Sequence, residues 1–194
     1  MPTIGFIGLG TMGGPMAGNL CRKGSSLVVF DVVPERMRTV EALGARAAAD
    51  VVGVAAESDV VFTMLPASAD VVEVVGGPNG LIARGRKGSL IVDMSTIDPL
   101  VTDRLAMGAA ACGIAFADAP VGRLASHAAR GESLFMVGAA DETFAKIRPF
   151  PDEPDLGFLT RRSADRRLRT RRLASKAPVQ QVHEQLRGVG LIPG

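Results

Sequence analysis

Short apolar runs alternate with longer stretches of mixed polarity along most of the chain. Each run has the length and the nearly continuous apolar character of a strand buried on both faces of a sheet, and the stretches between them indicate helices. The alternation, which continues to about residue 148, predicts an α/β fold with a doubly wound parallel sheet. The expected strands are Ile4–Ile7, Leu27–Phe30, Ala45–Ala48, Asp59–Pro66, Ser89–Asp93, Ile114–Asp118 and Ser133–Gly138.

Residue types at the segment ends predict where several helices begin and end. Proline in the first turn and a closing glycine suit a helix over Pro34–Gly44. An aspartate can cap a helix over Asp50–Ala56, and we expect Ser95 or Thr96 to cap the helix that covers Pro99–Ala111. Further helices are expected after Gly14 and over Ser68–Val75.

Three glycines follow the first apolar run at the spacing G-x-G-x-x-G. Between a strand and a helix, the first permits a sharp turn, the second lets the backbone approach a pyrophosphate, and the third lets the helix pack close to the strand. The helix start presents unpaired N–H groups to the anion. The alternative is an ordinary tight connection. We predict a dinucleotide-binding turn in a Rossmann-type fold, formed by Gly8, Leu9, Gly10, Thr11, Met12 and Gly13.

An aspartate ends the second apolar run, 18 residues after Gly13. This is where the Rossmann-type fold places the carboxylate that holds the adenosine ribose. The Asp31 carboxylate would accept hydrogen bonds from a 2′-hydroxyl but repel a 2′-phosphate, and no arginine follows it directly. NAD is therefore favoured over NADP as the cofactor. We expect Arg36 and Arg38 on the solvent face of the next helix.

Further candidate residues follow two central strands. In an open α/β sheet, ligands bind beyond the carboxyl ends of the strands. Met64, Leu65 and Pro66 are therefore expected beside the cofactor, with core packing as the alternative for the first two. By the same rule, the hydroxyls of Ser95 and Thr96 are candidates to bind the nicotinamide ribose or the substrate. Helix capping by one is compatible with ligand contact by the other.

Composition and charge suggest a soluble, cytoplasmic protein. Apolar residues make up 47% of the chain and the formal net charge is +2. No apolar stretch approaches the ~20 residues of a membrane span, and no basic region precedes the first apolar run, so no membrane segment is expected. Cys21 and Cys112 lack metal-ligand spacing, which favours reduced, packed thiols and no metal site.

Five motifs occur in order: GFIGLGTMGGPMAGNL at the start, FTMLP at 62–66, NGL at 79–81, VDMSTIDP at 92–99 and DAPVGR at 118–123. Together they resemble the β-hydroxyacid dehydrogenase family, which includes 3-hydroxyisobutyrate dehydrogenase and tartronate semialdehyde reductase. The resemblance covers about residues 1–150. It implies NAD(P)-dependent oxidation of an alcohol beside an acid group, or the reverse reduction of an aldehyde. It also implies a small anionic substrate. The family's oligomeric state depends on a further, helical domain, and the apolar surface exposed by the loss of that domain favours association into a homo-oligomer.

One loop departs from the family pattern. Most members have Ser-Gly-Gly after the Pro-Val, whereas this chain has Gly122, Arg123 and Leu124, which is similar to sulfolactaldehyde reductases. An arginine offers forked, permanently charged donors that suit a sulfonate or carboxylate. Gly122 and Arg123 are therefore candidate substrate-binding residues, with a surface arginine as the alternative. We expect His127, shortly after, to be a solvated loop residue and not an acid or base.

Residues 151–194 do not continue the resemblance. The family has here a helix with the pattern G-x-G-x-x-x-K-x-x-N, whose lysine is catalytic, and then a helical domain. This chain has seven arginines between 161 and 172, and the surroundings of Lys176 do not match, so no catalytic residue is assigned. We expect an NAD(P)-binding domain over 1–150 and a poorly ordered tail over 151–194.

Two explanations of the tail stay open. A reading-frame shift or truncation would replace the family's second half, and another frame after Phe150 would then encode the lysine helix. A basic extension is the alternative, although nucleic acid is not an expected partner because Phe158 is the tail's only aromatic residue. The chain is thus either an oxidoreductase with little or no turnover or a non-catalytic NAD-binding module with a basic tail.

Overall fold

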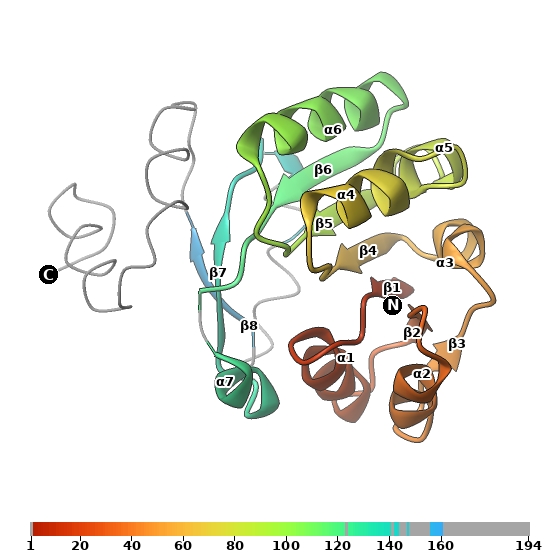
Figure 1. Cartoon of the computed structure of the whole chain (residues 1–194), viewed down its shortest axis with the longest axis vertical. Coiled ribbons are helices and arrows are strands. Elements are labelled where there is room, and N and C mark those ends of the chain that lie inside the picture. The colour runs from red at the N-terminus through yellow and green to blue at the C-terminus, as the bar shows by residue number, and fades with distance from the viewer. Residues whose placement is uncertain (1, 123, 141, 144–146, 148–155, 161–194) are drawn as a thin grey trace, which may run out of the picture.

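Six parallel strands form the centre of the molecule (Figure 1). In a computed structural model, which describes residues 2–122, 124–140, 142–143, 147 and 156–160, their order is β3-β2-β1-β4-β5-β6. Each strand pairs in parallel with its neighbour. This order confirms the predicted Rossmann-type, doubly wound sheet. The strands are β1 Ile4–Ile7, β2 Leu27–Phe30, β3 Arg46–Ala47, β4 Val60–Thr63, β5 Leu90–Asp93 and β6 Ala115–Asp118.

Helices cover both faces of this sheet, as Figure 1 shows. A π-helical turn over Val72–Gly76 continues α4, so the predicted helix over Ser68–Val75 is present in two parts. The short helices α5 and α7 were not predicted from the sequence. The helices are α1 Gly13–Arg22, α2 Pro34–Glu41, α3 Val51–Glu57, α4 Ser68–Val71, α5 Leu81–Arg84, α6 Pro99–Ala111 and α7 Ala125–Ala129.

Alternate residues along each strand divide the core into two layers. Phe6 of β1 belongs to the layer under α1, with Met16, whereas the next residue, Ile7, belongs to the opposite layer. In that second layer it joins Val54 of α3 and Leu105 of α6. Because helices cover both layers, both sets of strand residues must be apolar. This explains why the strands are continuous apolar runs in the sequence.

The strand β7, Ser133–Val137, does not join the parallel sheet, so that part of the sequence prediction is wrong. It pairs in parallel with β8, Leu156–Thr160, in a separate two-stranded sheet. Antiparallel bridges, Asp118–Gly138 and Val121–Phe135, connect it to the chain that leaves β6. The chain therefore turns back on itself after β6.

The course of the chain between β6 and β7, rather than the length of that connection, accounts for this reversal. A parallel return requires a crossover of a dozen or more residues, usually a helix that packs on the sheet. Here the only described helix in the connection is α7, with five residues. It packs beside α1, where the Asn19 side-chain amide donates a hydrogen bond to the Ala128 carbonyl oxygen at 2.8 Å. The sheet face is thus left without a crossover helix at this point.

β8 lies within the segment that we expected to be poorly ordered. Its residues pair with those of β7 one for one, from Ser133 with Leu156 to Val137 with Thr160. The sequence pattern did not predict this strand. The rest of the tail, 151–155 and 161–194, lies outside the described residues, and so does Lys176.

Two predicted helix starts are confirmed. Pro34 is the first residue of α2, and the Asp50 side chain caps α3 by accepting the Gly53 N–H at 2.8 Å. Both features follow from local chemistry, since proline has no N–H to leave unpaired and aspartate offers a short acceptor.

The predicted cap of α6 is wrong. The capping residue is Asp98, whose carboxylate accepts the Leu100 N–H at 2.8 Å, and not Ser95 or Thr96. A capping residue must stand directly before the first helical residue, which is Pro99, so the two hydroxyl residues are too far back along the chain. They are therefore free of any capping role in α6.

Candidate functional site

The glycines of the turn between β1 and α1 occupy three different environments. Gly8 has a φ of 92°, in the left-handed region, and a Cβ there would overlap the carbonyl oxygen of Met64. A Cβ on Gly13 would overlap the carbonyl oxygen of Gly8. Gly10 differs, because a Cβ placed there would have no atom within 4 Å. Two glycines thus allow close packing, and the third faces open space.

The residues between these glycines divide between the core and the surface. Leu9 is buried, Met12 packs against the core beneath α1, and Thr11 is exposed. No side chain caps the start of α1. The first N–H groups of a helix have no partner within the helix, so an anion beside this turn would find hydrogen-bond donors there.

Asp31 connects the end of β2 with the glycine turn. Its side chain is buried, Oδ2 accepts the Leu9 N–H at 2.6 Å, and Oδ1 accepts the Val33 N–H at 2.8 Å. A carboxylate offers about four acceptor sites, so Asp31 can hold the turn in place and still accept a further hydrogen bond. The position of Asp31 was predicted from the sequence, but its hydrogen bond with the Leu9 N–H was not.

An arginine forms an ion pair with the same carboxylate. The Arg36 guanidinium lies 3.3 Å from Asp31 Oδ1, although 48% of the arginine side chain is exposed. Arg38 is exposed and pairs with Glu35, as expected for the solvent face of α2. For Arg36 the expectation of a purely solvent-facing side chain was incomplete, because its positive charge lies beside the Asp31 carboxylate.

The loop after β4 lies against the glycine turn. Met64 and Leu65 are half-buried and pack against opposite core layers, while Pro66 is exposed. The Met64 carbonyl oxygen is the atom that a Cβ on Gly8 would overlap. The strand end, the loop and the turn therefore form one continuous surface at the carboxyl edge of the sheet.

A buried polar cluster at the ends of β4 and β5 escaped sequence analysis. Asp93 is fully buried, and its Oδ1 accepts hydrogen bonds from Thr63 Oγ1 at 2.8 Å and from Ser95 Oγ at 2.6 Å. The Ser95 N–H also donates to this oxygen, at 3.1 Å. Ser95 Oγ in turn accepts the Leu65 N–H at 2.9 Å. Burial raises the pKa of Asp93, and these hydrogen bonds oppose the rise.

A signal for this cluster was present in the sequence. The apolar run of β5 ends in an aspartate, and a serine follows two residues later. A charged group at the end of a strand buried on both faces must find partners, which here come from the adjacent strand and from the next turn.

The remaining candidates differ in their exposure. Thr96 is exposed, whereas Ser95 is buried and its hydroxyl is occupied on both sides. The Gly122 N–H donates to the Leu134 carbonyl oxygen at 2.7 Å. Arg123 lies outside the described residues. His127 is not a solvated loop residue: it belongs to α7, and its buried Nδ1 has no hydrogen-bond partner among the described residues.

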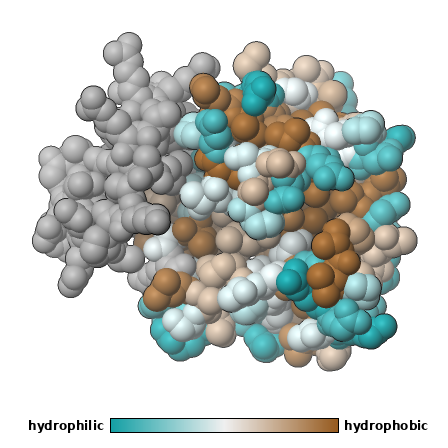
Figure 2. Space-filling model, viewed as in Figure 1, coloured by the Kyte–Doolittle hydropathy of each residue, from teal (hydrophilic) through white to brown (hydrophobic). Residues whose placement is uncertain are grey.

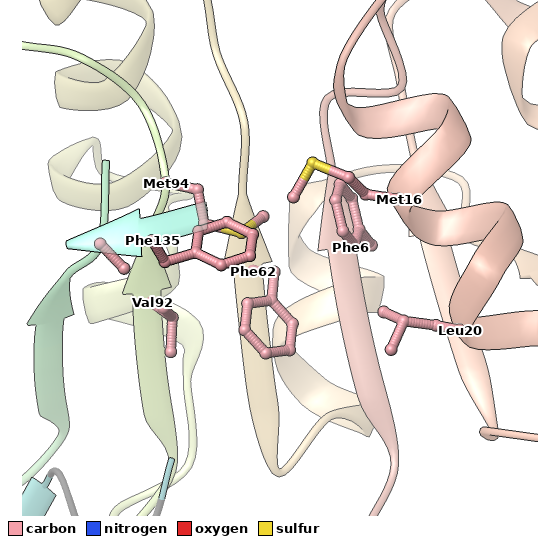
Figure 3. Close-up of a pocket in the computed structure, with 8 residues that line it drawn as sticks. Phe6, Met16, Leu20, Phe62, Val92, Met94 and Phe135 are labelled. Carbon is pink, nitrogen blue, oxygen red and sulfur yellow. The ribbon is translucent and has the colours of Figure 1, made fainter. Parts of the chain in front are cut away.

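A small apolar cavity lies between the sheet, α1 and β7 (Figure 3). Its volume is about 10 Å³, too small for any part of a dinucleotide. Since every lining side chain is apolar, the cavity offers no chemistry and belongs to the core. The lining residues are Phe6, Met16, Leu20, Phe62, Val92, Met94, Ala119 and Phe135.

In the described part of the chain, no group of three or more His, Cys, Asp or Glu residues could hold a metal ion. None of the helices described is long and apolar enough to cross a membrane. The Cys21 thiol is half-buried, and this burial raises its pKa, so it is a poor nucleophile.

The glycine turn and Asp31 fit a dinucleotide. Gly10 leaves room for a pyrophosphate against the backbone, α1 begins without a side-chain cap, and Asp31 retains acceptor capacity. These are three independent features of one edge of the sheet. Each matches a different part of such a ligand.

Comparisons with known proteins agree with this fit. A family model described as the NAD binding domain of 6-phosphogluconate dehydrogenase matches residues 3–153. Mitochondrial 3-hydroxyisobutyrate dehydrogenase from Mus musculus is 43% identical over 142 residues, which are 73% of this chain and 42% of that protein. 3-Sulfolactaldehyde reductase from Escherichia coli is 40% identical over 149 residues, 77% of this chain and 50% of that protein. The chain spans about half the length of these curated relatives.

A solved structure gives the same picture. 3-Hydroxyisobutyrate dehydrogenase from Mycobacterium tuberculosis, solved with L-serine, superposes with a TM-score of 0.74 and 32% identity. The superposition covers 82% of this chain and 54% of that protein.

Proposed function

The chain belongs to the family of the NAD binding domain of 6-phosphogluconate dehydrogenase, and on this premise we propose that it binds NAD as the cofactor domain of a β-hydroxyacid dehydrogenase. The glycine turn carries the proposal, because Gly8 and Gly13 close the turn tightly while Gly10 faces open space. The relatives named as a hydroxyisobutyrate dehydrogenase and a sulfolactaldehyde reductase support the reaction class. That class is oxidation of an alcohol, or reduction of an aldehyde, near an anionic group.

Each part of the site has a role in this proposal. The turn from Gly8 to Gly13 and the start of α1 hold the pyrophosphate, and Asp31 accepts hydrogen bonds from the adenosine ribose. Met64, Leu65, Pro66 and Thr96 lie at the carboxyl edge where the nicotinamide half would be placed. When bound, the nicotinamide supplies or accepts a hydride.

NAD is the preferred cofactor in this proposal. The Asp31 carboxylate would repel the 2′-phosphate of NADP, as expected for a group that bonds ribose hydroxyls. The Arg36 ion pair weakens that repulsion without removing it, since the guanidinium is half-exposed and screened by solvent.

The substrate in this proposal is small and anionic. The Thr96 hydroxyl is exposed at the same edge, and Arg123, five residues after the end of β6 in the sequence, would supply a positive charge. The N–H of the preceding residue, Gly122, already pairs with the Leu134 carbonyl oxygen. In this proposal Ser95 does not contact the ligand, and its hydroxyl acts only through its hydrogen bonds within the protein.

Turnover should be low or absent. The family's catalytic lysine helix has no counterpart in residues 151–194. General acid–base catalysis contributes about 10²–10⁴-fold, so a chain that lacks this group would bind cofactor yet react very slowly. The competing proposal, a non-catalytic NAD-binding module, is favoured by the same absence. Any turnover of an aldehyde acid would decide against it.

Self-association and a cytoplasmic location complete the proposal. Figure 2 shows apolar patches between hydrophilic ones on the face that carries α4 and α6. The exposed large apolar side chains include Val72, in the turn that continues α4, and Leu100 and Met107 of α6. Such side chains favour association when they are contiguous.

A substitution at Gly10 tests the binding proposal without disturbing the fold. Gly10→Ala adds a methyl group that meets no protein atom, but that occupies the space through which a pyrophosphate would approach the backbone. We expect the Kd for NADH to rise at least about tenfold. The midpoint of thermal unfolding, followed by circular dichroism, should not change. The chain has no Trp and no Tyr, so NADH fluorescence can be excited without interference.

The matched control is Gly108→Ala in α6, far from the turn. A Cβ there makes only an ordinary contact, 3.6 Å from Ile82 Cδ1. Its Kd should equal that of the wild type. Equal NADH binding by the wild type and Gly10→Ala would contradict the proposed site.

A further inference from the structure

The buried cluster around Asp93 connects the interior of the sheet to the surface of the proposed cofactor site. Ser95 has one hydroxyl proton, which it donates to Asp93 Oδ1 at 2.6 Å. The lone pairs of the same oxygen accept the Leu65 N–H at 2.9 Å. A chain of two hydrogen bonds therefore runs from a fully buried carboxyl to the backbone of the loop after β4.

That loop determines the room available beside the glycine turn. The Met64 carbonyl oxygen and the Leu65 side chain are the atoms that a Cβ on Gly8 would meet, so the loop and the turn are already in close contact. A shift of the Leu65 backbone would either press on Gly8 or open a gap beside it. Either change would alter the surface on which a dinucleotide lies.

We propose that Asp93 is a positioning residue for the dinucleotide site, acting through the Ser95 hydroxyl on the backbone N–H of Leu65. This inference rests on the proposed NAD-binding function. Asp93 itself is fully buried and touches no ligand. Its Oδ1 receives three hydrogen bonds, which orient Ser95 so that its free lone pair faces Leu65.

A comparison of two hydroxyl residues isolates this role. Ser95 and Thr63 are both buried and both donate to Asp93 Oδ1, at 2.6 Å and 2.8 Å. Only Ser95 continues the chain to Leu65. Ser95→Ala breaks the connection, whereas Thr63→Val removes a hydroxyl from the same oxygen and leaves the connection whole.

The conservative variant Asp93→Asn provides the rescue. The amide oxygen of asparagine can accept the same hydrogen bonds as Oδ1, and its NH₂ group takes the place of Oδ2, which has no hydrogen-bond partner among the described residues. If the asparagine amide were turned the other way, its NH₂ group would face the hydrogen-bond donors of Thr63 and Ser95, which is unfavourable. Asp93→Asn should therefore keep the connection, and Asp93→Ala should lose it.

The experiment measures NADH binding by fluorescence and the hydrogen exchange of the Leu65 amide by NMR, on the full 194-residue chain. For Ser95→Ala and Asp93→Ala we expect the Kd to rise about fivefold and Leu65 exchange to accelerate about tenfold, as for one lost hydrogen bond. Thr63→Val and Asp93→Asn should change either quantity less than about twofold. Thermal unfolding of each variant ensures that the folded state is compared.

Three outcomes would overturn the inference. If Ser95→Ala retains wild-type NADH binding and Leu65 exchange, the connection has no effect on the loop, while the proposed function stands. If Thr63→Val weakens binding as much as Ser95→Ala, the cluster acts through general stability. If the wild-type chain binds no NADH, the proposed function fails and the positioning role fails with it.

Discussion

The glycine turn and the buried cluster around Asp93 both fix the backbone at the carboxyl edge of the sheet, but they do so by different chemistry. At the turn, Gly8 and Gly13 allow backbone to approach backbone, and Asp31 then fixes the result through one side-chain acceptor. In the cluster around Asp93, the backbone is held by hydrogen bonds to buried side chains, chiefly those of Asp93 and Ser95. The first region depends on the absence of side chains, and the second depends on their hydrogen bonds.

This difference explains how each region can be recognised. Glycines required by close contact must occur at fixed spacing, so the turn is visible in the sequence. A side-chain cluster joins residues about 30 positions apart, such as Thr63 with Asp93 and Leu65 with Ser95. Its one local signal is the aspartate that ends β5 with a serine two residues later, and that signal does not identify the partners. The two regions should also respond differently to mutation. Glycine substitutions should disturb backbone packing, whereas substitutions of the buried polar residues should disturb the position of the loop after β4 and the pH dependence of stability.

The largest effect is expected for Gly13→Ala. The added Cβ would overlap the Gly8 carbonyl oxygen, which belongs to backbone and cannot move aside cheaply. We expect the free energy of unfolding to fall by about 3 kcal/mol or more, measured by urea denaturation. Gly108→Ala should leave stability unchanged or raise it by up to about 1 kcal/mol. A Gly13→Ala variant as stable as the wild type would mean that the turn is looser than described.

Asp31→Ala should mainly affect binding. It removes the acceptor for the Leu9 and Val33 N–H groups and the proposed ribose contact. Loss of a charged hydrogen bond corresponds to about a 10- to 100-fold rise in the Kd for NADH, measured by fluorescence. The control is Asp50→Ala, which removes the cap of α3 and should reduce stability by about 1 kcal/mol without affecting the Kd. Equal Kd values for both variants would argue against the role of Asp31.

A smaller effect should appear in the pH dependence of stability. Because burial raises the pKa of Asp93, the folded chain retains that proton at higher pH than the unfolded chain does. Stability from this group is therefore lost as the pH rises from the ordinary aspartate pKa through the raised value. Asp93→Asn has no proton to release, so urea denaturation across this range should show the wild type losing stability relative to the variant.

One outcome would contradict this linkage. A wild type that gains stability relative to Asp93→Asn with rising pH would show the opposite linkage. It would mean that the hydrogen bonds from Thr63 and Ser95 outweigh burial.

The smallest effect is expected at Arg36. Arg36→Gln removes a half-exposed positive charge 3.3 Å from Asp31 Oδ1, so it should increase discrimination against the 2′-phosphate. The ratio of the Kd for NADPH to that for NADH should rise about threefold, the scale of an exposed ion pair. Arg38→Gln, on the same helix but paired with Glu35, is the control. An unchanged ratio for Arg36→Gln would mean that Arg36 has no influence on cofactor choice.

Sequence reasoning predicted the features that depend on neighbours in the chain. The six strands, the glycine turn, Asp31 at the end of β2 and the Asp50 cap all follow from local spacing and residue chemistry. Sequence reasoning failed where the structure is determined by contacts between residues far apart in the chain. The direction of β7 depends on where the short helix α7 packs, which is beside α1. The partner of Arg36 depends on how α2 lies against β2.

The candidate site shows the same division. The positions of the glycines and Asp31 were predicted, but the occupied hydroxyl of Ser95 and the occupied N–H of Gly122 were not. Whether a polar group is free to meet a ligand depends on its partners in three dimensions. Spacing along the chain carries no record of them.

Cofactor binding and turnover by this chain can be measured in one cuvette. NADH is titrated into the chain and followed by nicotinamide fluorescence, and a small aldehyde carboxylate or sulfonate is then added while NADH absorbance is recorded. We expect saturable binding with no measurable oxidation of NADH. Absence of binding would contradict the proposed site, and rapid oxidation would mean that another group, His127 or Lys176 first, replaces the family's lysine.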